Sequence, residues 1–427
     1  MLAESAWEGL GQHLRARLDF ALRPTLRIEL ISAKAMASSP RKKVALRGDG
    51  EALIETFRHF PGALAVAGWL IAGWIDSQQE LLGRILRDEK VIHANFLRGS
   101  GVFCVTAICP GWSDPHNGGR SVTFLEFGKT GRVVYKPRPC DGEQLWFNAL
   151  RWLNLRGIAH SLRIPRLLAR KKYSWMEQLR PRECNSFAAV REFYFRWGAQ
   201  AALAQLLHAC DLHRENWLAI GKQPILVDAE LIGHTKCGSL PALLETGLLP
   251  LTRRDRVGAY RGIAPFDAAA LSEPPRTCWP SVKGTAQAPV KHVNDLVGGF
   301  RAVHHILADR RVATQFFDEI ISPMNRRRAH RTLFRSTAEY VWLLGVSLQP
   351  RLMAGLGKRR NWLQQECCGT GSSRAIALAE AHSLFRCDVP KFEARNKAIP
   401  RPQFLAAVVE LKASERLLRR RVLLGTH

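Results

Sequence analysis

Acidic residues are scarce in this sequence. Its 427 residues include 37 Asp and Glu against 63 Lys and Arg, which gives a formal net charge of +26. Such an excess predicts attraction to polyanions, whether nucleic acid, an anionic membrane, an acidic peptide or nucleotide phosphates, and it does not choose among them. The sequence carries no DNA- or RNA-binding motif and no platform of stacked aromatic residues, so we expect no specific nucleic-acid partner.

Paired cysteines are lacking as well. None of the ten cysteines forms a Cys-x-x-Cys pair, and the adjacent Cys367 and Cys368 suit neither a disulfide nor the usual zinc spacing. Scattered cysteines among apolar neighbours are typical of reduced core residues in a cytosolic protein. We therefore expect a cytoplasmic protein without a zinc site.

The sequence has no long uncharged apolar run. The N-terminus carries Glu4, Glu8 and Asp19 and has no apolar signal core. The longest uncharged apolar run, Phe60–Ile75, contains Pro61 and three glycines and is short for a membrane span. This run predicts a buried helix, and we expect no membrane span. Internal repeats and low-complexity segments are also missing.

The hydrophobic pattern predicts helices at both ends of the chain and strands between them. Residues 34–50 are rich in small and basic residues and predict a linker. Helices are expected over residues 1–33, 142–154 and 294–320, and between Glu51 and Asp88 with a division at Asp76–Ser77. A further apolar helix is expected to end at about Leu348, and the tail from Ala375 is expected to be helical as well.

A β-rich region follows the first helices. Val102–Ile108 is rich in β-forming residues, and Ser121–Phe127 and Arg132–Lys136 alternate around a glycine-containing turn, which predicts a hairpin. Lys136 ends the second strand of this hairpin, and Glu143 lies in the helix that follows. Strand, lysine and helix in this order are typical of a kinase small lobe, where the lysine pairs with nucleotide phosphates and with a Glu of the helix. An exposed lysine at a strand end is the alternative.

A glycine-rich turn lies between the first strand and the hairpin. Residues 111–122 place Asp114, His116 and three glycines around a proline. Glycines allow tight turns and a close approach of the backbone to a phosphate. An ordinary surface loop is the alternative for this turn.

The run from Phe193 to Glu230 carries the clearest chemical signal. It begins as a predicted amphipathic helix, turns polar at Asp211–Asn216, and ends in an apolar strand that delivers Asp228. A protein-kinase catalytic loop places its base Asp five residues before a metal-binding Asn, and a metal-binding Asp follows at the end of a strand. The same spacing predicts a phosphoryl-transfer loop. A helix end followed by a polar turn and a buried strand is the alternative.

Taken together, these segments resemble the dehydratase domain of class II lanthipeptide synthetases (LanM type). The resemblance extends from about residue 55 to about residue 395 and is carried, in the family's order, by SDPHNGGRSV, VVYKPRP, YSWME, REFYFRWG, DLHRENWLA, PILVDAE, RTLFRSTAEY and DVPKFEAR. It implies an α+β, bilobal fold related to protein and lipid kinases, with a small antiparallel β lobe, a mainly helical large lobe and helical additions. The implied domains are an N-terminal helix and basic linker (1–50), a helical addition with the small lobe (51–182), and the large lobe with a helical elimination segment (183–427).

The resemblance also implies a two-step reaction with ATP and Mg²⁺. Ser and Thr hydroxyls of a ribosomal precursor peptide are phosphorylated, and the phosphate is then eliminated to leave dehydroalanine or dehydrobutyrine. Carried over residue by residue, the implied phosphorylation residues are Lys136, Asp211, His213, Asn216 and Asp228, and the implied elimination residues are Asp114, His116, Arg331 and Thr337.

The residue types suit the phosphorylation step. Asp211 would orient or deprotonate the attacking hydroxyl, and Asn216 and Asp228 offer hard oxygen ligands for Mg²⁺. Lys136 would hold nucleotide phosphates. His213, two residues after Asp211, would contact phosphate or shape the loop.

The residue types of the elimination set are equally suitable. His116 or Asp114 would take part in proton transfer, and the sequence leaves open which group is the base. Arg331 would grip the departing phosphate through its planar guanidinium, and Thr337 would add a hydroxyl hydrogen bond. An arginine on a solvated face is the alternative for Arg331.

The chain departs from the family in length. Full-length members continue into a zinc-binding cyclase domain. We expect no cyclisation by this chain, and a separate cyclase is one possibility that stays open. The dehydratase region is also short, which is compatible with a stand-alone dehydratase, a truncated product or a degenerate relative. Two further functions therefore stay open: a kinase-like protein that only phosphorylates, and a non-catalytic module that binds a polyanion or a partner.

Overall fold

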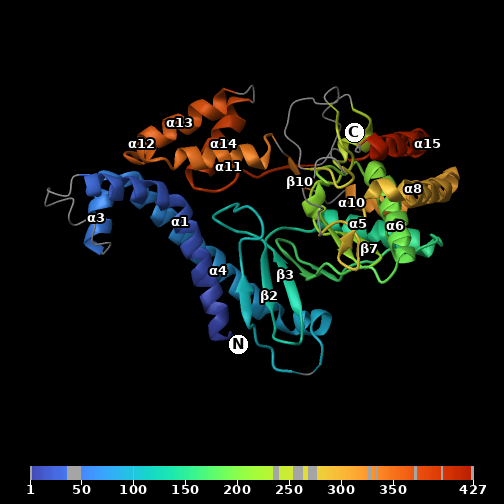
Figure 1. Cartoon of the computed structure of the whole chain (residues 1–427), viewed down its shortest axis with the longest axis horizontal. Coiled ribbons are helices and arrows are strands. Elements are labelled where there is room, and N and C mark those ends of the chain that lie inside the picture. Colours follow the sequence, from blue (N-terminus) through green and yellow to red (C-terminus); the bar gives the residue numbers. More distant parts are fainter. Residues whose placement is uncertain are drawn as a thin grey trace. The chain divides into compact units, whose positions relative to one another are not determined.

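The computed structural model has an α+β fold with a small antiparallel sheet, as the sequence predicts (Figure 1). Its contacts divide the chain into two compact units. Unit 1 consists of Met1–Arg138, Lys171–Gln178 and Leu333–Lys391, and unit 2 of Pro139–Arg170, Leu179–Thr332 and Phe392–His427. The structure describes residues 2–35, 50–99, 101–233, 240–252, 263–267, 277–325, 329–332, 334–369, 373–395 and 398–424.

Unit 1 contains the predicted hairpin. Strands β2 (Thr123–Glu126) and β3 (Arg132–Lys136) pair antiparallel, with Thr123 opposite Tyr135. β1 (Ala107–Cys109) flanks β2, and β5 (Ser174–Glu177) flanks β3, so these four strands follow the order β1-β2-β3-β5. The hairpin is therefore confirmed, whereas only the end of the β-rich run before it forms a strand.

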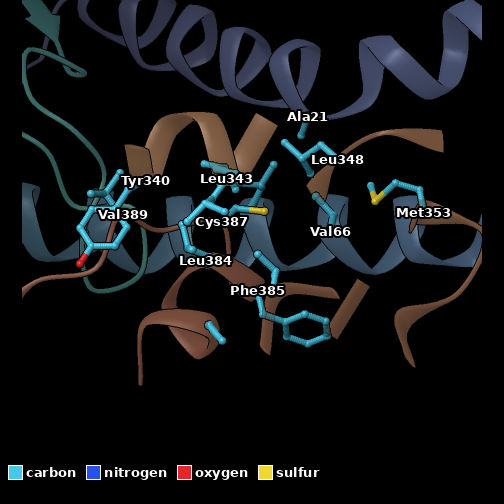
Figure 2. Close-up of a cluster of buried hydrophobic side chains, with 14 of the residues drawn as sticks. Ala21, Val66, Tyr340, Leu343, Leu348, Met353, Leu384, Phe385, Cys387 and Val389 are labelled. Atoms are coloured by element: carbon cyan, nitrogen blue, oxygen red, sulfur yellow. The ribbon is translucent and has the colours of Figure 1, made fainter. Parts of the chain in front are cut away.

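Helices of unit 1 pack around one apolar cluster, part of which Figure 2 shows as sticks. α1 runs alongside α4, and α11 to α14 supply most of the other side chains (Figures 1 and 2). The helices are α1 (Glu4–Ala35), α3 (Gly50–His59), α4 (Pro61–Phe96), α11 (Thr337–Ser347), α12 (Pro350–Met353), α13 (Leu356–Cys368) and α14 (Arg374–Phe385).

The predicted division at Asp76–Ser77 is wrong, because α4 continues without a break through both residues. The Ser77 hydroxyl donates to the carbonyl oxygen of Trp74 at 2.9 Å, one turn back, so this polar side chain is satisfied inside the helix. Burial of the apolar run before Asp76 is one-sided: Val66 is fully buried, while Leu64 is 53% exposed. No single helix among the described residues is long and apolar enough to cross a membrane, although α3 and α4 together, with a bend of 115° between them, have the length and apolar composition of a span.

Unit 2 is built around α6 (Phe187–Leu206), which packs closely on α8 (Val293–Leu307). A Cβ at Gly198 would overlap the carbonyl oxygen of Leu296, so glycine is required for this approach of the two backbones. The other elements are α5 (Asp141–Leu155), β4 (Leu167–Ala169), a 3₁₀ turn (Arg214–Asn216), β6 (Trp217–Ile220), β7 (Gln223–Leu226), α7 (Ala242–Glu245), β8 (Ser281–Val282), β9 (Thr285–Ala286), a second 3₁₀ turn (Pro289–His292), α9 (Arg310–Phe316), a π-helical turn (Phe317–Ile321), α10 (Ser322–Asn325), β10 (Ala329–Thr332), β11 (Phe392–Arg395) and α15 (Arg401–Leu424).

Several predictions for unit 2 need correction. α6 begins at Phe187, before the predicted start, and its second half is buried on all sides, so it is not amphipathic there. The single helix predicted over 294–320 is interrupted at Asp309, whose carboxylate accepts the Arg311 N–H at 2.7 Å and caps a new helix. The pairing of β10 with β11 was not predicted at all.

Candidate functional site

The loop that carries Asp211 follows α6 directly. Main-chain hydrogen bonds hold it on both sides: the Cys210 N–H donates to Leu231 O at 2.8 Å, and the Leu212 N–H donates to Thr246 O at 2.9 Å. Asp211 itself has a φ of 62°, in the left-handed region that residues other than glycine rarely adopt. Strained backbone of this kind persists only where its surroundings hold it, and it is enriched at functional sites.

The β6–β7 hairpin brings the two predicted metal ligands to the same end of one structure. Asn216 directly precedes β6, Asp228 follows β7 by two residues, and Trp217 pairs with Leu226. The Val227 N–H donates to Asn216 O at 2.9 Å and extends this pairing by one step. Both side chains therefore leave the backbone at the open end of the hairpin, beside the Asp211 loop.

Hydrogen bonds determine the orientation of the Asn216 amide. Its Nδ2 donates to the carbonyl oxygen of Asp211 at 2.8 Å. Since that partner can only accept, the amide oxygen is the end of the side chain that remains for a cation. His213 joins the same group, with Nε2 at 3.9 Å from an Asp211 carboxylate oxygen, and its Nδ1 accepts the Glu215 N–H at 3.3 Å.

These oxygens are of the type that a magnesium ion takes from protein side chains. Mg²⁺ prefers hard oxygen ligands and usually takes only one or two carboxylates from the protein, with phosphates and water filling the rest. One carboxylate, Asp228, and one amide oxygen, Asn216, match that pattern. No group of three or more His, Cys, Asp or Glu residues arranged to hold a metal occurs in the described part of the chain.

The start of α5 lies against the segment that carries Asp228. A Cβ at Gly142 would overlap the carbonyl oxygen of Ala229, the residue after Asp228. Glu143, the next residue of α5, is fully buried. Five of the residues singled out in the sequence therefore belong to segments of unit 2 that meet near the open end of the β6–β7 hairpin: Glu143, Asp211, His213, Asn216 and Asp228.

Lys136 belongs to unit 1 and ends strand β3, opposite Ser174 of β5. Its side chain is only 4% exposed, so the alternative of an exposed strand-end lysine is wrong. That Lys136 pairs with Glu143, and that it meets Asp228 over one nucleotide, both stay predictions.

The glycine-rich turn of unit 1 is a tight, left-handed loop. His116 and Arg120 exchange two main-chain hydrogen bonds of 3.0 and 2.9 Å, and between them Gly118 and Gly119 have φ values of 86° and 82°. The Arg120 guanidinium pairs with Glu80 of α4, and Arg120 and Tyr135 of β3 line one small polar pocket. The turn therefore packs beside the strand that carries Lys136.

One ring nitrogen of His116 has a defined role. Nδ1 lies 2.7 Å from the carbonyl oxygen of Val389, which can only accept, so Nδ1 carries a proton. In the neutral ring the lone pair is then on Nε2, which makes Nε2 the atom suited to take up a proton.

Thr337 is the first residue of α11, in unit 1. Ser336 caps this helix and its hydroxyl accepts the Glu339 N–H at 3.2 Å, which is the pattern S-x-x-E of a capping box. Arg335 is buried and donates to Glu380 at 3.2 Å, to Glu339 at 2.7 Å and to the carbonyl oxygen of Cys367 at 2.7 Å. The helix start that presents Thr337 is therefore rigidly held.

Arg331 lies in β10 of unit 2, opposite Glu393 of β11, and its side chain is outside the described part of the structure. The nine predicted site residues thus divide between the units: Asp114, His116, Lys136 and Thr337 in unit 1, and Asp211, His213, Asn216, Asp228 and Arg331 in unit 2.

Sequence reasoning missed the residues that support these positions. Asp388, which accepts hydrogen bonds from the glycine-rich turn, lies within the quoted motif DVPKFEAR and was not singled out. Arg335 and Ser336 lie in the quoted motif RTLFRSTAEY. The capping-box pattern at Ser336 was readable from the sequence alone, whereas the partners of Asp388, and Glu380 as a partner of Arg335, are distant in the chain.

Comparison with protein families gives a match over most of this chain. The family described as "Domain of unknown function (DUF4135)" matches residues 61–277 and 264–395. The chain belongs to this family.

A curated relative matches the chain as well. The "Lacticin 481/lactococcin biosynthesis protein LcnDR2" of Lactococcus lactis subsp. lactis is 22% identical over 288 residues, which cover 56% of this chain. The chain covers 30% of the length of that relative. The resemblance to class II lanthipeptide synthetases (LanM type) is confirmed by this pair of matches.

Proposed function

We propose that this protein is a lanthipeptide-type dehydratase that acts on Ser and Thr residues of a ribosomal precursor peptide with ATP and Mg²⁺. The observation that carries the proposal is the β6–β7 hairpin, which sets Asn216 and Asp228 at one end beside the Asp211 loop. A relative whose name places it in lantibiotic biosynthesis adds support. A kinase-related fold, a cytoplasmic location and a separate cyclase as partner belong to the same proposal.

Phosphorylation needs a positioned hydroxyl and compensation of phosphate charge. Asp211 orients the Ser or Thr hydroxyl of the peptide and accepts its proton as the oxygen attacks the terminal phosphorus of ATP, and ADP leaves with the electrons of the P–O bond that breaks. Asn216 and Asp228 would hold Mg²⁺, which would supply charge compensation at the nucleotide phosphates. Lys136 adds a second positive charge to the same phosphates.

Elimination breaks two bonds of the phosphorylated residue. A base removes the proton on Cα, the electron pair forms the Cα=Cβ double bond, and phosphate departs from Cβ with the electrons of the C–O bond. Nε2 of His116, directed by the bond from Nδ1 to Val389, suits the proton transfer. Arg331 and Thr337 stabilise the departing phosphate.

Mass spectrometry of a synthetic panel of Ser- and Thr-containing peptides, incubated with the protein, ATP and Mg²⁺, tests this function. Loss of one water per modified residue is the expected result. Phosphate adducts that accumulate would favour the alternative that the chain only phosphorylates. Unchanged peptides together with salt-sensitive binding to polyanions would favour a non-catalytic module.

Two variants separate the two steps. Asp211→Ala is expected to block every modification, and Arg331→Ala is expected to trap phosphopeptide. Arg311→Ala is the matched control for the second variant, because Arg311 is an exposed arginine at the start of α9 in the same unit. Dehydration by Asp211→Ala at the normal rate would contradict the proposed role of the loop.

A further inference from the structure

The segment after α14 alternates between the core and the glycine-rich turn. Cys387 and Val389 are 4% and 2% exposed and belong to the apolar cluster of unit 1, where Figure 2 shows both side chains. Asp388 between them is 6% exposed and reaches the glycine-rich turn instead. The core therefore determines where this carboxylate points.

The segment is anchored by Arg359 of α13, which is fully buried. Its guanidinium donates to the carbonyl oxygens of Leu384 and Phe385 at 2.9 and 2.7 Å, at the C-terminal end of α14. It also lies 3.4 Å from the sulfur of Cys387. A positive charge at a helix C-terminus is favourable, so Arg359 secures the helix end from which Asp388 extends.

Four hydrogen bonds join this segment to the glycine-rich turn. The Asp388 carboxylate accepts the N–H groups of Gly118 and Gly119 at 2.5 and 2.8 Å. Main-chain groups of Val389 supply the other two: its N–H donates to Pro115 O at 2.8 Å, and its carbonyl oxygen accepts His116 Nδ1 at 2.7 Å. The segment is thus hydrogen-bonded to the turn both before and after His116.

Helices α1 and α4 approach the turn closely. A Cβ at Gly119 would overlap the Arg17 guanidinium of α1, and a Cβ at Gly73 of α4 would come within 2.8 Å of Gly118 O. Burial raises the pKa of Asp388, and the two N–H donors oppose that effect. The carboxylate is thus the hydrogen-bond acceptor for both glycine N–H groups, and the buried N–H of Gly119 would be costly to leave without a partner.

We propose that Asp388 is a positioning residue for elimination: its carboxylate holds the Gly118–Gly119 turn, so that Val389 can orient the imidazole of His116. This inference rests on the proposed function and goes beyond it, since Asp388 does not touch the reacting atoms. It assigns to the segment after α14 the task of keeping His116 in the geometry that proton abstraction needs.

Amide exchange tests the hold on the turn without any substrate. In Asp388→Asn one acceptor oxygen is replaced by a donor, so exchange of the Gly118 and Gly119 amides is expected to quicken by about 10- to 100-fold, as for a lost hydrogen bond to a charged group. The ¹⁵N spectrum of the His116 ring, assigned by its loss in His116→Gln, should change from one tautomer to a mixture. Asp19→Asn, an exposed aspartate of α1 paired with Arg23, is the control and should change neither signal. Unaltered exchange and an unaltered ring spectrum in Asp388→Asn would overturn the inference.

Activity separates positioning from general damage. The probes are synthetic peptides made in two forms, with free Ser or with phosphoserine, given to the full chain with ATP and Mg²⁺. Asp388→Asn should phosphorylate the free peptide at the wild-type rate and eliminate from the phosphopeptide roughly 100-fold more slowly, since small misplacement of a reacting group has effects of that size. Asp388→Glu, which keeps the carboxylate, should recover part of the elimination rate.

A second variant covers the case in which Asp388→Asn does not fold. Gly119→Ala disturbs the same turn from the side of Arg17, and it should slow elimination while phosphorylation persists. Normal elimination by either folded variant would overturn the inference. If the wild-type chain consumes neither peptide, the proposed function has failed, and the exchange and ring measurements still decide whether Asp388 holds the turn.

Discussion

Two polar loops carry most of the candidate residues, and they are held in different ways. The Asp211–Asn216 loop of unit 2 is secured by main-chain bonds to Leu231 and Thr246, which lie 21 and 34 residues after the Cys210 and Leu212 N–H groups that donate to them. The glycine-rich turn of unit 1 is secured by a side chain that lies 270 residues further on, Asp388. A loop supported by its neighbours can be recognised from spacing alone, whereas a loop supported from far away cannot.

The largest effect is expected from Asp211→Asn, in the locally supported loop. The amide keeps the shape of the side chain and cannot accept the hydroxyl proton, so phosphorylation should fall by about 10²–10⁴-fold, the usual range for a general base. Elimination from a phosphopeptide should persist, because its residues belong to a different set. Rates measured with free and phosphorylated synthetic peptides check both statements. Asp318→Asn, an exposed aspartate paired with Arg401, is the control. Loss of both steps in Asp211→Asn would mean that the two loops do not act separately.

Arg359→Met should produce the largest loss of stability in unit 1. The substitution removes a buried guanidinium and leaves the carbonyl oxygens of Leu384 and Phe385 without these donors. A loss of about 3 kcal/mol or more in the free energy of unfolding is expected, because each hydrogen bond from a charged group contributes about 1.5–3 kcal/mol. Urea denaturation measures the loss, and Arg360→Met, an exposed neighbour on the same helix, is the comparison. An unchanged denaturation midpoint would show that Arg359 does not anchor the segment that carries Asp388.

Ser336→Ala should have a moderate effect, confined to the start of α11. Loss of an N-cap side chain costs about 1 kcal/mol. Because Thr337 is the first residue of that helix, fraying there should slow elimination more than phosphorylation. Denaturation midpoints and the two peptide assays measure these effects, and Ser336→Asp should restore the cap. Equal slowing of both steps would argue against a specific role for this helix start.

The smallest expected effect is on how the stability of unit 1 depends on pH. Burial, assisted by the nearby Arg17, lowers the pKa of His13 from 6.5 to about 4. The unfolded chain therefore takes up this proton first, so the contribution of His13 to stability should decrease as pH falls from about 6.5 to about 4 and should change no further below that range. The effect is small because the ring is partly exposed. His13→Gln should flatten this part of the stability curve, measured by denaturation at several pH values, and an identical slope in the variant would exclude His13 as its source.

Local patterns predicted the elements whose supports are also local. The β2–β3 hairpin, α5 and α11 follow from periodicity and turn residues, and all three are confirmed. The division expected at Asp76–Ser77 is wrong because the Ser77 hydroxyl bonds back to its own helix. The β10–β11 pair was missed because its two strands are separated by about 60 residues, and no local pattern names a partner at that distance.

The amino-acid sequence by itself determined the chemistry that this protein can offer: the spacing of Asp211, Asn216 and Asp228, the lysine at the end of a strand, and a glycine-rich turn with an acid and a histidine. Only the tertiary structure decided how those groups are held, since Asp388, Arg359 and Glu380 act on residues that are remote in the chain. The physical reason is that the spacing of residues in the sequence determines only which side chains a short backbone segment places near one another. A buried charge finds its hydrogen-bond donors only after the core has packed and has placed them next to it.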